Sequence, residues 1–268
     1  MGRLTARRNV VRINGAVVLT RPDTLVVEEP LEIRVSGQVL TVTMRTPGDD
    51  MDLAAGFLVS EGAITRTDEL REMRFCAGAD DTGKNSYNVL DLALTVPSPR
   101  PRATYTTSSC GICGTASLEA VRTTASFDVS RDPLRLEPSQ LTALPHALRQ
   151  AQRVFDKTGG LHAAGLFRDG ELLCLREDVG RHNAVDKVVG WALREGLLPL
   201  TGTVLMVSGR ASFELVQKAW MAGIPCLAAV SAPSSLAVDL ANEAGLTLIG
   251  FLRGDSMNIY SAAQRVLP

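Results

Sequence analysis

Residues 203–230, TVLMVSGRASFELVQKAWMAGIPCLAAV, decide the fold of this chain. Two short apolar runs, 203–207 and 226–230, are typical of buried strands, and the helix-forming stretch 213–222 separates them. The same alternation continues outward, with further helices at 182–194 and 234–244 and a further strand at 246–251. Apolar strands separated by helices of this length predict a mainly parallel sheet that is covered on both faces.

The N-terminal part of the chain predicts a smaller α+β unit. Residues 1–23 are rich in arginine and predict a strand or an arm that lies on the body of the protein. The following residues predict strands and one helix from their apolar pattern, with Asp49 and Asp50 as the helix cap. The strands are expected at 31–35, 39–44, 72–76 and 87–94, and the helix at 51–58.

A linker and a long helix join the two units. Residues 126–138 are expected to form the linker, and residues 139–158 predict a helix that ends at Gly159 and Gly160. Asp169 and Gly170 then predict a tight hairpin turn between strands at 163–167 and 171–176. We therefore expect an N-terminal α+β domain at 1–125, the linker at 126–138 and an α/β domain at 139–268.

Composition and charge exclude several classes of protein. With 45% hydrophobic and 21% charged residues in 268, the chain has the composition of a globular protein with a sizeable core. Its formal net charge of −1 shows no basic footprint for nucleic acid. No apolar run of about eighteen residues predicts a membrane span, and the N-terminus does not resemble a signal peptide. Five cysteines, an odd number, do not suggest a secreted disulfide framework, so we expect a cytoplasmic protein.

The stretch Ser108-Ser109-Cys110-Gly111-Ile112-Cys113-Gly114 is the strongest candidate for chemistry. Helix-forming residues follow it, so helix N-terminal amides would lie beside the two sulfurs and favour the nucleophilic thiolate. The residues leave three interpretations open: a dithiol redox pair, a pair that handles sulfur, and half of a zinc site. Cys76, Cys174 and Cys226 each stand alone in an apolar run. This favours redox or sulfur chemistry, and no structural metal is expected.

Three turns rich in glycine and arginine follow predicted strands. The candidate binding residues are Gly180, Arg181 and His182 in the first turn, Gly209 and Arg210 in the second, and the run 250–258 in the third. Ligands of open α/β sheets bind beyond the carboxyl ends of the strands, where these turns would converge. Arginines and helix N-terminal amides favour a phosphate-bearing ligand, although neither standard nucleotide loop is present. For most of the charged residues at 176–187, the alternative to ligand binding is an ordinary helix N-terminus whose charges face the solvent. His182 could be a general acid or base, or it could be a capping residue.

Two further stretches resemble the zinc-binding motifs of nucleobase deaminases. They are residues 160–164, GLHAA, and residues 224–229, IPCLAA. However, Ala164 replaces the glutamate that moves the proton, and Ala229 replaces the second cysteine ligand. Deaminase chemistry is therefore not expected, even if the fold is shared.

Taken together, several of these stretches resemble the FdhD family. They fall in one order along the chain, at 109–114, 159–162, 177–187, 208–210, 253–254 and 257–258. The run at 176–187 is the most specific of them, and the resemblance extends from about Pro30 to Tyr260.

This resemblance implies a sulfur carrier, a sulfurtransferase that formate dehydrogenase requires. Cys110 would receive sulfane sulfur from a cysteine desulfurase as a persulfide, and Cys113 would assist exchange or release. The recipient would be the molybdenum bis(guanine dinucleotide) cofactor. The implied fold is a small α+β domain joined to a three-layer α/β domain of cytidine-deaminase-like fold, and the implied assembly is a homodimer. The alternative is a zinc-binding or dithiol redox protein that uses Cys110 and Cys113.

The resemblance also indicates which turn would bind the cofactor first. Its residues are Phe251, Leu252, Arg253, Gly254, Asp255 and Ser256. Asp255 departs from a phosphate-binding pattern, because a carboxylate would repel a phosphate unless it faces the guanine N–H groups.

Overall fold

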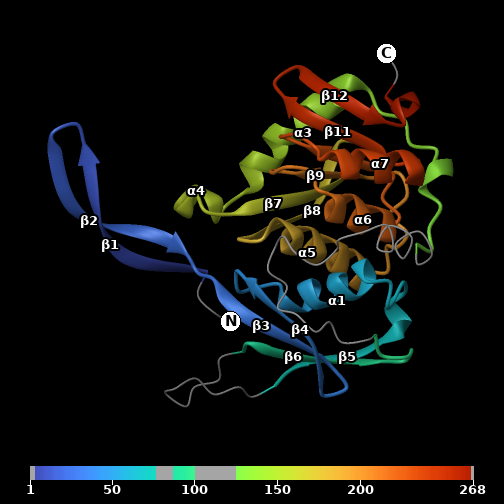
Figure 1. Ribbon diagram of the computed structural model, residues 1–268, viewed down its shortest axis with the longest axis horizontal. Helices are drawn as coiled ribbons and strands as arrows, with labels where there is room; N and C mark the ends of the chain where they lie inside the picture. Colours follow the sequence, from blue (N-terminus) through green and yellow to red (C-terminus); the bar gives the residue numbers. More distant parts are fainter. Residues whose placement is uncertain (1–3, 77–86, 100–124, 267–268) are drawn as a thin grey trace.

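The computed structural model describes residues 4–76, 87–99 and 125–266 (Figure 1). The N-terminal elements are β1 (Thr5–Asn14), β2 (Val17–Val26), β3 (Glu29–Val35), β4 (Gln38–Arg45), α1 (Asp50–Ser60), η1 (Thr67–Glu69), β5 (Leu70–Phe75) and β6 (Val89–Leu94). The C-terminal elements are η2 (Val129–Arg131), α3 (Pro138–Ala151), α4 (Phe155–Thr158), β7 (His162–Arg168), β8 (Glu171–Asp178), α5 (Arg181–Arg194), β9 (Val204–Val207), α6 (Phe213–Met221), β10 (Cys226–Ala229), α7 (Ser235–Ala244), β11 (Thr247–Arg253), β12 (Ser256–Ser261) and η3 (Ala263–Arg265). Of the helices in the described ranges, none is long and apolar enough to cross a membrane.

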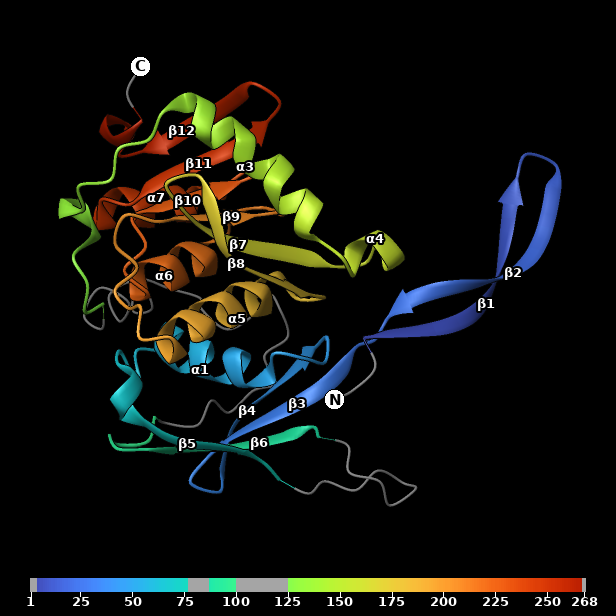
Figure 2. The ribbon, with the colours of Figure 1, turned by 180° about the vertical axis from the view of Figure 1, so that it is seen from behind.

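The smaller sheet has the strand order β4-β3-β6-β5. Strands β3 and β4 form an antiparallel hairpin whose turn residues, Ser36 and Gly37, both have positive φ. Strand β6 lies parallel to β3 and antiparallel to β5. The alternation seen in the sequence of β3 buries Leu31, Ile33 and Val35 on one face, and α1 packs against this sheet (Figure 2). The mixed α/β architecture and these predicted strands are confirmed.

The larger sheet has the order β12-β11-β10-β9-β7-β8, and the prediction that it is mainly parallel is wrong. Only β9, β10 and β11 run parallel, whereas β7 runs antiparallel to β9. Each end of the sheet is closed by a hairpin. The β7–β8 hairpin turns at Asp169 and Gly170, both with positive φ, as the sequence predicts. The β11–β12 hairpin adds an edge strand that the sequence analysis does not anticipate.

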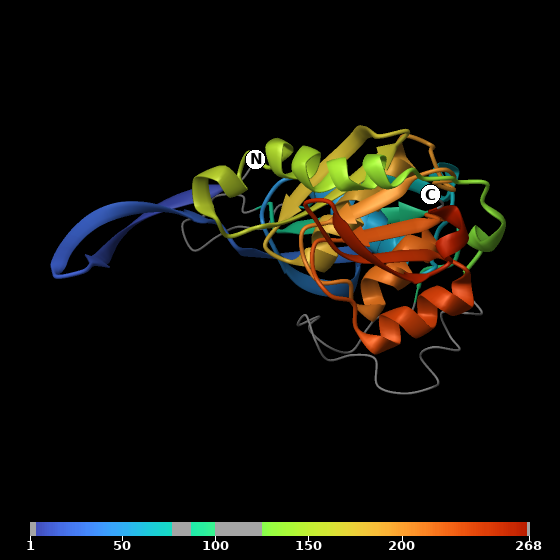
Figure 3. The same ribbon diagram turned by 90° about the horizontal axis from the view of Figure 1, so that it is seen from above.

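Helices cover both faces of the larger sheet, as Figure 3 shows from above. Helix α3 places Leu141, Leu144 and Leu148 on one face, and α5, α6 and α7 lie on the other. The single helix predicted at 139–158 is wrong, because α3 ends at Ala151 and a separate short helix follows. That short helix does end at Gly159, in the left-handed conformation that glycine tolerates best.

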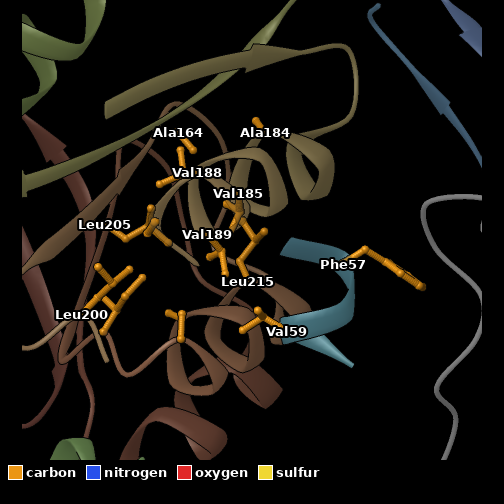
Figure 4. Close-up of a cluster of buried hydrophobic side chains, with 14 of the residues drawn as sticks. Phe57, Val59, Ala164, Ala184, Val185, Val188, Val189, Leu200, Leu205 and Leu215 are labelled. Atoms are coloured by element: carbon orange, nitrogen blue, oxygen red, sulfur yellow. The ribbon is translucent and has the colours of Figure 1, made fainter. Parts of the chain in front are cut away.

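The two sheets share one hydrophobic core through the pair of helices α1 and α5 (Figure 4). These helices touch at Gly56 and Gly190. A Cβ at Gly56 would lie 1.8 Å from the backbone oxygen of Asp186, and one at Gly190 would lie 1.8 Å from that of Asp52. Only glycine permits this approach. The boundaries at residues 125 and 139 stay a prediction, since the core is continuous across the two sheets.

The N-terminal hairpin of β1 and β2 projects from the body instead of lying on it (Figure 1). Its strands pair along their full length, but most of their side chains are exposed. The predicted strand is therefore confirmed and its predicted place is wrong.

Candidate functional site

The candidate site lies at the edge of the larger sheet where β8, β9 and β11 end. Strands β8 and β9 both run antiparallel to β7, so their carboxyl ends meet at this edge together with that of β11. The turns at 178–182 and 208–212 and the β11–β12 turn are therefore on one side of the molecule, the left side in Figure 1. This is the edge that the topology of α/β sheets favours for ligands.

Two histidines bring the first two turns together. His182, in the first turn of α5, has its Nε2 3.2 Å from Ser212 Oγ and 3.6 Å from Glu214 Oε2. His162, at the start of β7, lies against Gly209, where a Cβ would stand 3.4 Å from the imidazole Nδ1. Three chain segments thus converge on one small polar cluster: the start of β7, the turn at 180–182 and the segment 208–214.

The electrostatics of this cluster differ between its members. Hydrogen bonding to His182, together with bonds from its own N–H and from Ser212, lowers the pKa of Glu214 to about 2. Burial lowers the pKa of His162, and the nearby charges of Arg181 and His182 lower it further. The site therefore combines a fixed carboxylate with an imidazole that remains neutral to a lower pH than usual.

The Glu214→Gln variant tests the carboxylate. A depressed pKa stabilises the fold above the ordinary value of 4.5, and that contribution is lost as the pH falls towards 2. Because the side chain is 38% exposed, we expect a loss on the order of 1 kcal/mol in unfolding free energy at neutral pH. Chemical denaturation from pH 7 to pH 2 should show the difference between wild type and variant shrinking below about pH 4.5. The Asp239→Asn variant, at an exposed carboxyl of α7, serves as control, and a difference that does not change with pH would contradict this account.

Arg181 is the residue best placed to meet an anion. It is the first residue of α5, after the N-cap Gly180, and so lies at the positive end of a helix of 14 residues. Its Nε is buried and has no hydrogen-bond partner among the described residues. An unsatisfied buried guanidinium nitrogen is costly, and a phosphate oxygen would satisfy it.

Most other residues of the 176–187 run are structural and buried, so the expectation of a solvated face is wrong. Asp178 is fully buried and pairs with Lys187 at 2.8 Å. Its oxygens also accept the backbone N–H of Thr46 at 3.1 Å, that of Gly180 at 2.8 Å and the side-chain amide of Asn183 at 3.0 Å. Lys187 donates to the carbonyl of Thr46 at 2.9 Å. This network fixes the turn that carries Arg181 and His182.

The remaining acids of the run also have structural partners. Glu177 accepts two backbone amides at the start of α4, at 2.9 and 2.8 Å. Asp186 accepts hydrogen bonds from Ser60 Oγ at 2.6 Å and from Lys218 Nζ at 2.8 Å. The high density of charges in this run therefore ties several elements together, and within the described residues only the Nε of Arg181 in this run is buried without a partner.

The sequence predicts that the third turn follows the last strand, and this is wrong. The turn joins β11 to a further strand, β12, in a β-hairpin. Phe251 has a φ of 52° and donates its backbone N–H to Ser231 at 3.2 Å. The Arg253 guanidinium lies over its ring, 5.8 Å from the centroid. Leu252 is fully buried in the core, while Arg253 and the next three residues, 254–256, are exposed.

The third turn stands apart from the histidine cluster along the edge. The turn at 231–234 lies between them, since Ala211 donates to the carbonyl of Ala232 at 3.2 Å and Ser234 donates to that of Ala211 at 3.0 Å. The structure thus brings together the first two predicted turns and places Phe251–Ser256 further along the same edge. Arg210 and Arg253 are both exposed there.

Cys110 and Cys113 lie outside the described residues. Burial raises the pKa of Cys174 and of Cys226 to about 12, so neither provides a thiolate near neutral pH. Cys226 pairs in the sheet with Val204, at the end of the sheet opposite to His162. The two deaminase-like stretches therefore do not come together. Within the described ranges, no group of three or more His, Cys, Asp or Glu side chains is placed to hold a metal ion.

Sequence reasoning did not single out Ser212 and Glu214 as site residues. Glu214 lies 32 positions after His182 on a different helix. Only the packing of α5 beside α6 brings the two together. The sequence did contain one signal: His182 and Glu214 each lie in the first turn of a helix, α5 and α6 respectively, that follows a strand.

Comparisons with known proteins agree with one another. A model of the FdhD/NarQ family matches residues 26–267. The chain is 64% identical to the sulfur carrier protein FdhD of Streptomyces avermitilis, over 99% of the chain and 97% of the relative. It is 41% identical to the protein of the same name from Saccharolobus solfataricus, over 99% of the chain and 100% of the relative. A crystal structure from Desulfotalea psychrophila, described as that of a candidate formate dehydrogenase accessory protein, has a TM-score of 0.76 at 26% identity and covers 99% of this chain and 100% of its own.

Proposed function

Because the chain belongs to the FdhD/NarQ family, we propose that it is a sulfur carrier needed for the maturation of formate dehydrogenase. The observation that carries this proposal is the 64% identity, over nearly the full length of both chains, to a protein named as a sulfur carrier. In this proposal, the chain accepts sulfane sulfur from a cysteine desulfurase and transfers it to the molybdenum bis(guanine dinucleotide) cofactor. The transfer takes place in the cytoplasm, before the cofactor enters the dehydrogenase.

The sulfur is held as a persulfide on Cys110. The Cys110 thiolate attacks the outer sulfur of the donor's cysteine persulfide, so that a new S–S bond forms on Cys110 as the donor's S–S bond breaks. The donor leaves as a thiolate, and no external oxidant or reductant is consumed. Cys113 assists when the sulfur is passed on. The raised pKa values of Cys174 and Cys226 support this choice, because neither thiol is ionised near neutral pH.

The recipient cofactor is a substrate that binds at the carboxyl edge of the larger sheet. It carries several phosphates and two guanines. At a helix N-terminus the site offers the Nε of Arg181, which has no hydrogen-bond partner in the described part of the chain. His182 lies beside it, with its Nε2 3.6 Å from Glu214 Oε2, and Gly209 allows the imidazole of His162 to approach the backbone of the second turn. Arg210, the half-buried Phe251 and the exposed hairpin residues 253–256 extend the contact along the same edge, and Leu252 anchors the hairpin in the core. The exposed Asp255 would serve a guanine better than a phosphate.

Sulfur loading tests the proposal directly. The reduced protein is incubated with a cysteine desulfurase and cysteine, and its intact mass is then measured. We expect a gain of about 32 Da per sulfur, reversible by a thiol reductant. A protein that instead gains no mass and retains zinc after dialysis would be a zinc protein. A reversible loss of about 2 Da without any gain would indicate a dithiol redox pair. Either result would overturn the proposal.

A further inference from the structure

Two helices begin next to each other at the candidate site. Helix α5 starts at Arg181 after its N-cap Gly180, and α6 starts at Phe213 after its N-cap Ser212. The two helices pack side by side (Figures 1 and 2), and the 3.2 Å contact between His182 Nε2 and Ser212 Oγ joins their N-terminal ends. Both N-termini carry the positive end of a helix dipole, which attracts anions. The edge therefore has two places where a phosphate group could bind.

The N-terminus of α6 already holds an anion, the carboxylate of Glu214. This side chain lies in the first turn and accepts hydrogen bonds from His182, from its own backbone N–H and from Ser212. These bonds lower the pKa of Glu214 to about 2, so the carboxylate keeps its negative charge throughout the neutral range. Ser212 is of the residue type that N-caps prefer, yet its side chain makes no bond to the helix backbone. Its hydroxyl is directed to His182 and Glu214 instead.

The N-terminus of α5 holds no such anion. Its first turn contains no acidic residue, and its first residue, Arg181, has a buried Nε without a hydrogen-bond partner in the described part of the chain. The acid that precedes this helix, Asp178, is fully buried, and the ammonium group of Lys187 balances its charge at 2.8 Å. A phosphate at α5 would therefore gain a free donor, whereas a phosphate at α6 would meet a fixed negative charge.

His182 can serve only one anion through its Nε2. A ring nitrogen carries a single hydrogen, and a carboxylate only accepts hydrogen bonds, so the hydrogen of Nε2 faces Ser212 and Glu214. A phosphate oxygen that approaches the same side of the ring must displace the carboxylate and is also repelled by it. This competition weakens the binding of a phosphate group and speeds its release. Fast release suits a carrier, because a carrier has to hand on what it binds.

We propose that Glu214 is a specificity-determining residue that occupies the N-terminus of α6 and the Nε2 of His182, so that this part of the edge binds phosphate at α5 alone. The inference rests on the proposed function for the nature of the ligand, a phosphate-bearing substrate, and adds which of the two helices receives the phosphate. The carboxylate acts as an internal anion that competes with the phosphate for His182. Removal of its charge opens a second phosphate position beside the first.

Calorimetric titration of the full-length protein with inorganic pyrophosphate tests this inference. The Glu214→Gln variant should bind pyrophosphate about 10-fold more tightly than the wild type, because it loses a negative charge next to His182 and frees the N-terminus of α6. The matched control is Asp68→Asn, which removes the same charge from an exposed carboxyl. Its neighbour Thr67 contacts the carbonyl of Leu193 at the far end of α5, about 20 Å away by the rise of the helix. This control should bind pyrophosphate as the wild type does.

A second background shows whether the gain passes through His182. Glu214→Gln should add much less affinity when His182 is also replaced by glutamine, because the freed imidazole is then absent. A role of Glu214 in the fold alone predicts the opposite sign, since a loosened turn binds pyrophosphate more weakly. Equal or weaker binding by Glu214→Gln would overturn the inference, and so would an equal gain in Asp68→Asn or a gain that is undiminished without His182.

The titration is independent of sulfur. If neither the wild type nor Glu214→Gln bound pyrophosphate in the millimolar range, the inference would be overturned as well. The loading of sulfur on the wild type needs no phosphate ligand, so it would still decide the proposed function separately.

Discussion

Replacing Cys110 by alanine should abolish the transfer of sulfur while leaving the fold intact. The variant has no thiolate at the position that is proposed to attack the donor's persulfide, so it cannot hold the sulfur. We expect no gain of about 32 Da after incubation with a desulfurase and cysteine. We also expect no activation of formate dehydrogenase in cells that depend on this protein. Intact mass and dehydrogenase activity are the two measurements.

Two further variants make this result specific to Cys110. Cys113→Ala should still gain the sulfur but should pass it on more slowly, because Cys113 acts after loading. Cys174→Ala removes a buried thiol whose pKa is raised to about 12, and it should load and transfer as the wild type does. Undiminished loading in Cys110→Ala would show that another residue carries the sulfur. If all three variants lost sulfur loading to the same extent, the result would instead indicate a general disturbance of the fold.

Replacing Gly56 by alanine should lower the stability of the whole protein by about 3 kcal/mol. In an exposed helix this change would stabilise by up to about 1 kcal/mol, because alanine favours the helix. Here the added Cβ would lie 1.8 Å from the backbone oxygen of Asp186. Backbone atoms cannot rotate away as a side chain does, so α1 and α5 must separate and lose the packing between them. The steric cost therefore exceeds the gain in helix propensity.

The measurement for Gly56→Ala is the midpoint of thermal unfolding. For a chain of this length, 3 kcal/mol corresponds to a decrease of about 6–12 °C. The matched control is Gly160→Ala, where the nearest atom to the new Cβ is a methyl group of Val26 at 3.3 Å, which can shift. A Gly56→Ala protein as stable as this control would show that the two helices tolerate a wider separation.

The elements of the core were largely predictable, because burial and turn residues determine them locally. Strands β9, β10 and β11 are short apolar runs that fall where the sequence indicates. Strand β12 was not predictable, since its sequence, SMNIYS, mixes polar and apolar residues and is only partly buried. It is a strand because it pairs with β11. For the same reason the direction of β7 against β9 depends on the fold and cannot be read from its residues.

The site was predictable in its parts but not in its partners. The position of Arg181 and His182 in a turn between a strand and a helix follows from local sequence. The hydrogen bond from His182 lowers the pKa of Glu214, and this bond forms only because α5 packs beside α6. Similarly, the acids of the 176–187 run look like solvated charges in the sequence. Asp178 is buried because Thr46, on a distant part of the chain, and Lys187, in the helix that follows, satisfy it.

The bond between Asp178 and Thr46 makes the candidate site and the smaller sheet one cooperative unit. Thr46 immediately follows β4, the edge strand of that sheet, and supplies both a donor to Asp178 and an acceptor for Lys187. If β4 detached, a buried ion pair would lose two of its hydrogen bonds at the moment that the Arg181 turn lost its support. Detachment of β4 should therefore cost about 1.5–3 kcal/mol for each of these two hydrogen bonds to a charged group. A ligand held by Arg181 should also protect residues in β4, although they belong to the other half of the chain.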